Sequence, residues 1–123
     1  MATIKSFTSL EQSQKLTEIL PHESADMVYV HTVDLEGDEH YDIDFRNNQP
    51  LFEDDISAWS LAALLNYLKS KNKFPEIKEL SDGRFKLTTY IWDGEDCIQV
   101  SIGDIIVDAC YEMILKLHER NLL

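Results

Sequence analysis

The sequence is poor in the residues that break, crosslink or anchor a chain. It has 4 Gly, 3 Pro and 2 Cys among 123 residues, and its longest uninterrupted apolar run is the five residues 61–65. A membrane-spanning helix needs roughly 20 apolar residues. Collagen-like, disulfide-scaffold and membrane-spanning classes are therefore excluded. Because 44% of the residues are apolar, we expect one folded domain over residues 1–123.

Basic residues are also scarce. The chain has 11 Lys+Arg against 23 Asp+Glu, a net charge of −12. Nucleic acids and anionic membranes both attract basic surfaces, so direct binding to either is disfavoured. Solubility, cation binding and a basic protein partner remain open. The charge is uneven, with −8 over residues 34–55, +3 over residues 69–86 and −5 over residues 93–108.

The two cysteines, Cys97 and Cys110, lack the spacing of a zinc or disulfide motif. Each lies in an apolar pattern, so we expect buried free thiols. Residues 1–7 contain no apolar segment of the kind found in signal peptides. These features predict a reduced, cytoplasmic protein.

Three helices are predicted, over residues 9–20, 57–70 and 104–120. Thr8 and Glu11 fit a capping box before the first helix, and Pro21 ends it. Apolar residues recur at helical spacing in the second and third. Acidic residues near the start and basic residues near the end of these two helices complement the helix dipole.

Five strands are predicted, over residues 27–33, 40–45, 76–80, 84–92 and 97–102. Turn residues join the first two strands and the last three as hairpins. We expect Tyr41, Ile43, Leu87 and Val100 to point into a shared interior, with Ile98 and Ile102 in phase with Val100. The order α-β-β-α-β-β-β-α predicts an α+β fold, in which three helices pack on one antiparallel sheet of four to five strands.

Three segments carry a resemblance. The first contains SFTSLEQS (6–13), ILP (19–21) and SADM (24–27); the second is WSLAALL (59–65); the third contains VDA (107–109), MI (113–114), LHE (117–119) and NLL (121–123). They resemble small uncharacterised proteins encoded by gut bacteria and their phages, for which no activity is known. The resemblance implies a cytoplasmic protein derived from a phage or mobile element, and it brings no catalytic residues.

The outward face of the 84–92 strand is the predicted partner-binding surface. Lys86, Tyr90 and Trp92 alternate there, with Gln99 and Ser101 expected beside them on the next strand. A mixed aromatic and polar sheet face suits a protein partner or a small ligand. The alternative is that a helix covers this face and the aromatic residues belong to the core.

A weak metal candidate lies on the 40–45 strand, where His40, Asp42 and Asp44 alternate on one face. Antiparallel pairing could bring these residues near Lys86 and Tyr90. With a ligand from a second strand, such as His31, they would suit a divalent cation, but the solvated face of a strand is the favoured explanation. The sequence has no nucleophile elbow and no phosphate-binding glycine loop, so we predict no catalytic residue and no cofactor.

The function predicted from these features is that of a small non-enzymatic interaction protein with an unknown, basic protein partner. Two alternatives stay open. One is an acidic mimic of nucleic acid that inhibits a basic host protein, and the other is a metal-assisted hydrolase using His40, Asp42 and Asp44. Uncovered sheet edges would also allow a homodimer.

Overall fold

The described chain forms three α-helices and two antiparallel sheets of three strands each. The computed structural model describes residues 5–46, 52–92 and 96–123, without the side chains of residues 91–99. The helices are α1 (Leu10–Leu16), α2 (Leu61–Ser70) and α3 (Ile106–Glu119), with a 3₁₀ turn η1 (His22–Ser24). The strands are β1 (Met27–Val33), β2 (Glu39–Phe45), β3 (Ile56–Ala58), β4 (Glu76–Glu79), β5 (Phe85–Trp92) and β6 (Asp96–Gly103).

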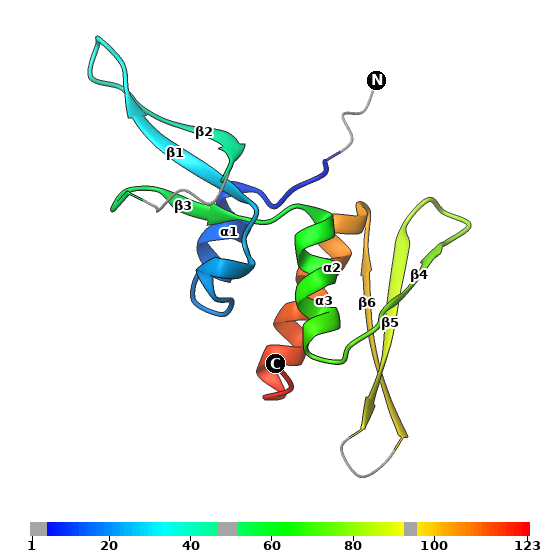
Figure 1. The fold of residues 1–123 in the computed structure, drawn as a ribbon. Coiled ribbons are helices and arrows are strands. Elements are labelled where there is room, and N and C mark those ends of the chain that lie inside the picture. Colours follow the sequence, from blue (N-terminus) through cyan, green and yellow to red (C-terminus); the bar gives the residue numbers. More distant parts are fainter. Residues whose placement is uncertain (1–4, 47–51, 93–95) are drawn as a thin grey trace.

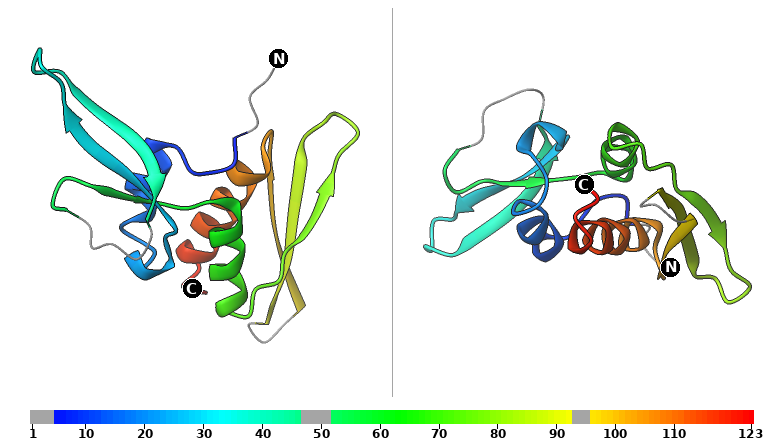
Figure 2. Two further views of the ribbon diagram at one scale, coloured as in Figure 1. Left: turned by 45° about the horizontal axis from the view of Figure 1, so that its top comes forward. Right: turned by 90° about the horizontal axis from the view of Figure 1, so that it is seen from below.

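The two sheets lie on opposite sides of the helices (Figure 1; Figure 2). Their strand orders are β2-β1-β3 and β4-β5-β6. Helices α2 and α3 run side by side, and α3 packs on β5 and β6. The α+β class is confirmed, but the prediction of one continuous sheet is wrong. Strand β3, which was not predicted, occupies the free side of β1 and closes the first sheet at three strands.

The segment before α2 explains why β3 was missed. Residues 57–60 were predicted as the first turn of the helix, but Ser57 and Ala58 pair with β1. The helix begins at Leu61, where the Ser60 hydroxyl accepts the Ala63 N–H at 3.1 Å as an N-cap. A serine precedes the apolar run at both places, so the sequence offers two plausible caps and pairing with β1 decides between them.

Helix α1 begins at Leu10, one residue later than predicted, and ends at Leu16 rather than Leu20. Its capping box is also shifted by one residue and is formed by Ser9 and Gln12. Thr8 has a different role, because its buried hydroxyl accepts the Trp59 N–H at 3.1 Å and shares a hydrogen bond with the Ser13 hydroxyl at 2.8 Å. The prediction of Thr8 as the cap is therefore wrong.

The main core lies between the helices and the inner face of the second sheet. Trp59, Leu64, Leu87 and Met113 are fully buried in it, and each such side chain contributes about 1.5–3 kcal/mol relative to exposure. A smaller cluster lies where α1 covers the base of the first sheet. Its members are Met27, Tyr29 and Ala58, with Phe7, Leu10, Ile43 and Ile56 packed against them.

Strand β6 has the opposite phase from the one predicted. Ser101 is buried and donates its hydroxyl hydrogen to the Ala109 carbonyl at 2.7 Å, whereas Ile102 is 43% exposed. Gly103 lets α3 approach closely, because a Cβ at this position would lie 2.8 Å from the Ala109 nitrogen. The outward position predicted for Ser101 and the inward position predicted for Ile102 and Val100 are wrong, since alternation alone does not say which side the helix covers.

None of the described helices is long and apolar enough to cross a bilayer. Cys110 is a buried free thiol, as predicted, and burial raises its pKa to about 12. The Cys97 side chain lies outside the described part of the chain.

Candidate interaction surface

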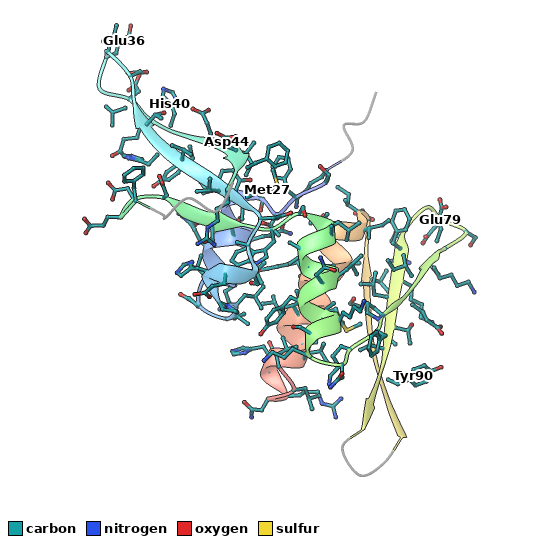
Figure 3. All side chains as sticks on the ribbon, in the orientation of Figure 1. Met27, Glu36, His40, Asp44, Glu79 and Tyr90 are labelled. Carbon is teal, nitrogen blue, oxygen red and sulfur yellow. The ribbon has the colours of Figure 1, made fainter. Side chains whose placement is uncertain are left out.

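Residues 31–45 form an acidic arm, which comprises the outer half of β1, the turn and all of β2. It projects from the helical body, and both of its faces are open to solvent along most of β2 (Figure 1; Figure 3). The arm contains six acidic residues and neither Lys nor Arg. The hairpin reaches beyond the two cores, and within it Ile43 packs against the smaller core at its base.

Asp34 shapes the tip of the arm. Its Oδ1 accepts the backbone N–H groups of Glu36 and Asp38, each at 2.9 Å, and its Oδ2 lies 2.8 Å from His40 Nε2. The hydrogen bond with His40, followed by the backbone N–H groups, lowers the pKa of Asp34. Gly37 has a φ of 86°, a conformation that glycine adopts readily. These contacts give the exposed turn a defined shape.

One face of the arm is largely apolar. Strand register places Val33, Tyr41, Ile43 and Phe45 on it, in line with the smaller core at the base. The same face carries His31 and Glu39, whose Nε2 and Oε1 atoms lie 3.4 Å apart. Val33 is 59% exposed and Phe45 is 68% exposed. Tyr41 lies with its ring centre 5.1 Å from that of His31. The expectation that Tyr41 points into a shared interior is wrong, because the sheet extends past the helix that covers its base.

The opposite face carries His40, Asp42 and Asp44, as the alternation predicts. These residues stand across from Thr32, Val30 and Val28 of β1. Among the described residues, no group of three His, Cys, Asp or Glu side chains is placed to hold a metal ion. His40 is instead held by Asp34. The geometry gives the metal-assisted alternative no support.

The predicted partner-binding surface lies on the second sheet, away from the arm. Tyr90 is 53% exposed, Lys86 is half-buried, and both are on β5. The side chains of Trp92 and Gln99 lie outside the described residues, but the register opposes Gln99 to the buried Thr89 and opposes Tyr90 to Ile98. The expected proximity to His40 and Asp42 is wrong, because β2 and β5 belong to different sheets.

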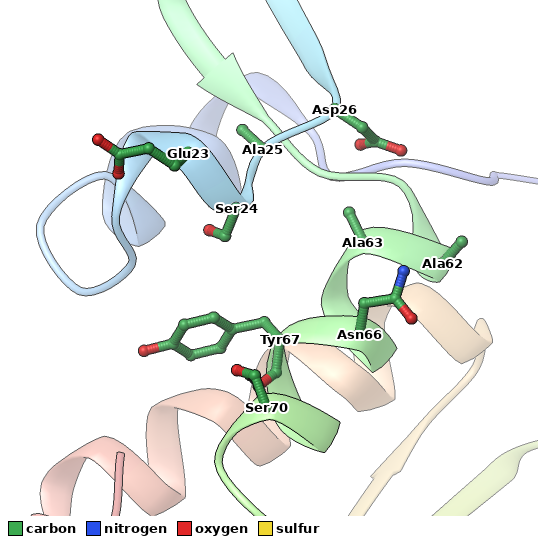
Figure 4. A pocket seen from close by; sticks show the side chains of 9 residues that line it. All are labelled: Glu23, Ser24, Ala25, Asp26, Ala62, Ala63, Asn66, Tyr67 and Ser70. Atoms are coloured by element: carbon green, nitrogen blue, oxygen red, sulfur yellow. Dashed lines mark hydrogen bonds between the residues drawn. The ribbon is translucent and has the colours of Figure 1, made fainter.

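A pocket of about 400 Å³ lies between η1 and α2 (Figure 4). Several of its polar groups are engaged in the fold. The Ser24 hydroxyl accepts the Trp59 indole N–H at 2.9 Å, and the Asp26 carboxylate accepts the Ser60 N–H at 2.9 Å. Burial raises the pKa of Tyr67, which keeps its phenol neutral. The pocket is lined by Glu23, Ser24, Ala25, Asp26, Ala62, Ala63, Asn66, Tyr67 and Ser70.

The sequence contained part of the signal for the arm. The charge of −8 over residues 34–55 marks the right segment, and the turn at Gly37 marks the hairpin. The exposure of Val33 and Phe45 was not predicted, because alternation cannot show where the covering helix ends. Leu35, whose side chain is fully exposed in the turn, was not singled out.

Comparisons with protein-family models, with curated proteins and with solved structures gave no match. The function therefore has to be inferred from the surfaces of the chain itself.

Proposed function

We propose that this chain is a non-enzymatic interaction protein that binds a basic partner protein through the acidic arm. The observation that carries this proposal is the coincidence of apolar exposure and acidity on one projecting hairpin. Val33, Leu35 and Phe45 are each more than half exposed there, and Tyr41, which lies between Val33 and Phe45 on one face, is 38% exposed. Exposed apolar side chains that share a face are typical of interaction sites.

The charge of the arm supports a basic partner. Its six acidic residues lie on a hairpin without a Lys or Arg to neutralise them. Their summed field attracts positively charged surfaces and speeds the encounter with them, whereas it repels acidic ones. The apolar face can then supply affinity as its side chains leave water. Such binding should weaken as salt rises, because the exposed charges are screened.

Quantitative affinity purification from a native lysate tests this proposal. The test variant carries Glu36→Gln, Asp38→Asn, Asp42→Asn and Asp44→Asn on the arm. The control variant carries the same change in charge at exposed positions of α1, α3 and the turn after α1, with Glu11→Gln, Glu18→Gln, Glu112→Gln and Glu119→Gln. We expect basic proteins to be retained by the wild type and the control but lost by the arm variant. Equal retention by all three forms would overturn the proposal.

An acidic mimic of nucleic acid is a second candidate. The observation that favours it is that the acidic residues of the −8 segment described here, residues 34–46 and 52–55, all belong to the first sheet and its connections. Carboxylates would then stand in for phosphates on a basic groove. Competition separates the two functions, because duplex DNA should displace the chain from its partner only if the chain occupies the nucleic-acid groove.

A further inference from the structure

The outer edge of β2 presents backbone groups that no strand of the described chain uses. Strand β2 lies at the edge of its sheet, with β1 on its other side. Asp26 and Arg46 are joined by a backbone hydrogen bond at 3.0 Å, as are Asp34 and Asp38. In an antiparallel ladder, such bonded pairs alternate with unbonded pairs. The even-numbered residues of β2 therefore bond to β1, and the odd-numbered residues direct their N–H and C=O groups outward.

Two other outward amides of this sheet already have side-chain partners. On the opposite side of the sheet, beyond the end of β3, Asp55 Oδ1 accepts the His31 N–H at 3.2 Å. At the end of β2, Asp44 Oδ1 accepts the Phe45 N–H at 2.8 Å. Tyr41 and Ile43 precede Phe45 on the outer edge of β2 and have no such cap within the described residues. They provide two donors and two acceptors at the spacing of a β-ladder.

We propose that an extended segment of a partner protein adds to this edge as a fourth strand. In this segment, basic and apolar residues alternate. Side chains of an added strand alternate between the two faces of the sheet. On one face they would meet Asp42 and Asp44, which favour Lys or Arg. On the other face they would meet Tyr41 and Ile43, which favour apolar residues. This inference rests on the proposed function and specifies how the partner binds.

A second copy of this chain does not suit the same edge. Two arms would place carboxylates opposite carboxylates, and like charges across a strand pair are destabilising. Acidic side chains on an edge strand also prevent uncontrolled pairing between sheets. Pairing between the β2 edges of two copies is therefore disfavoured, whereas pairing with a basic strand is favoured.

Titration of the full chain with synthetic peptides tests the proposal. One peptide alternates Lys and Val over seven residues, and its control has the same composition with the lysines and valines in separate blocks. We expect the alternating peptide to bind at least about tenfold more tightly, because only it can match both faces while forming the ladder. The variant Asp42→Asn/Asp44→Asn should reduce this preference, whereas Glu112→Gln/Glu119→Gln on α3 should preserve it.

Backbone methylation of the peptide separates strand addition from simple charge attraction. Methyl groups on alternate amides give two peptide sets, of which one blocks the amides that face β2 and the other blocks those that face solvent. We expect about a tenfold loss of affinity or more in one set and little change in the other. Equal affinities for both sets and for the block peptide would overturn strand addition. The proposed function would survive that result if arm-dependent capture of basic proteins persists, and it fails separately if that capture is absent.

Discussion

Asp108 joins three separate parts of the chain. Its Oδ1 accepts hydrogen bonds from Lys5 Nζ at 2.6 Å and from Gln12 Nε2 at 2.9 Å. Burial alone would raise the pKa of Asp108, but the hydrogen bonds from Lys5 and Gln12 outweigh it and hold the pKa below its usual value. At the scale of single residues, this contact links α3 to the N-terminal segment and α1, so its removal should destabilise the packing between them.

We expect Asp108→Asn to lower the free energy of unfolding by about 1 kcal/mol at pH 7, because the partly exposed ion pair is screened. A carboxyl with a lowered folded-state pKa stabilises the fold above its unfolded-state pKa of about 3.9, and this contribution is lost as the pH falls through the folded-state pKa. Urea unfolding should therefore show a difference from wild type that shrinks as the pH falls below the unfolded-state pKa of about 3.9. Glu112→Gln, an exposed change on α3, is the control, and an equal loss in both variants would contradict the assignment.

Cys110 is the residue for which burial has the clearest chemical consequence. Its pKa of about 12 leaves almost no thiolate at neutral pH, and only the thiolate is a strong nucleophile. We expect iodoacetamide to spare Cys110 at pH 8 in the folded protein and to modify it after unfolding in urea. Mass spectrometry of the peptide that contains Cys110 measures this directly. Rapid modification in the folded state would show that α3 opens locally.

At the scale of elements, the contact between β6 and α3 depends on Gly103. A methyl group there would lie 2.8 Å from the Ala109 backbone nitrogen, where no flexible side chain can move aside. We expect Gly103→Ala to lower the free energy of unfolding by about 1–3 kcal/mol, the usual cost of overpacking. Thermal unfolding compares it with Asp104→Ala, an exposed neighbour that should change stability by less than about 0.5 kcal/mol. Equal melting temperatures would show that the helix can shift without cost.

The arm carries two acids, Asp42 and Asp44, that few contacts tie to the fold. Asp42 is exposed and makes no ion pair among the described residues, and Asp44 contacts only the neighbouring Phe45 N–H through its side chain. We expect Asp42→Asn/Asp44→Asn to leave the melting temperature unchanged or raised, because neutralisation relieves repulsion on the hairpin. Differential scanning calorimetry measures the shift. A fall equivalent to about 2 kcal/mol would mean that these acids stabilise the sheet.

Local pattern predicted most elements and missed how they are partnered. Alternation correctly separated Tyr41 and Ile43 from His40, Asp42 and Asp44, because side chains of a strand must alternate. The same rule misassigned Val100 and Ser101, since the inner side of β6 is chosen by the approach of α3 at Ala109. Whether β1 joins the strands of the second sheet or pairs with the short β3 likewise depends on tertiary contacts, which a local stretch of sequence does not contain.

At the scale of the whole molecule, the two sheets differ in how much of each is covered by the helices. The second sheet and the helices hold the larger core, whereas the first sheet is covered only at its base and extends into solvent. The predicted site on β5 and the observed arm therefore lie on different parts of the protein. Composition indicated an acidic protein and left a basic partner open, but only the fold shows that the acids and the exposed apolar residues share one hairpin.

Amide hydrogen exchange at Tyr41 and Ile43 tests the central claim most directly. Measured by NMR on the full chain, both amides should exchange rapidly alone, because they face outward at the edge of β2. When a basic partner or the alternating peptide is bound, both should become protected, with little change in α3. Binding that leaves these two amides unprotected, or that protects the second sheet instead, would contradict the assignment of the arm as the interaction site.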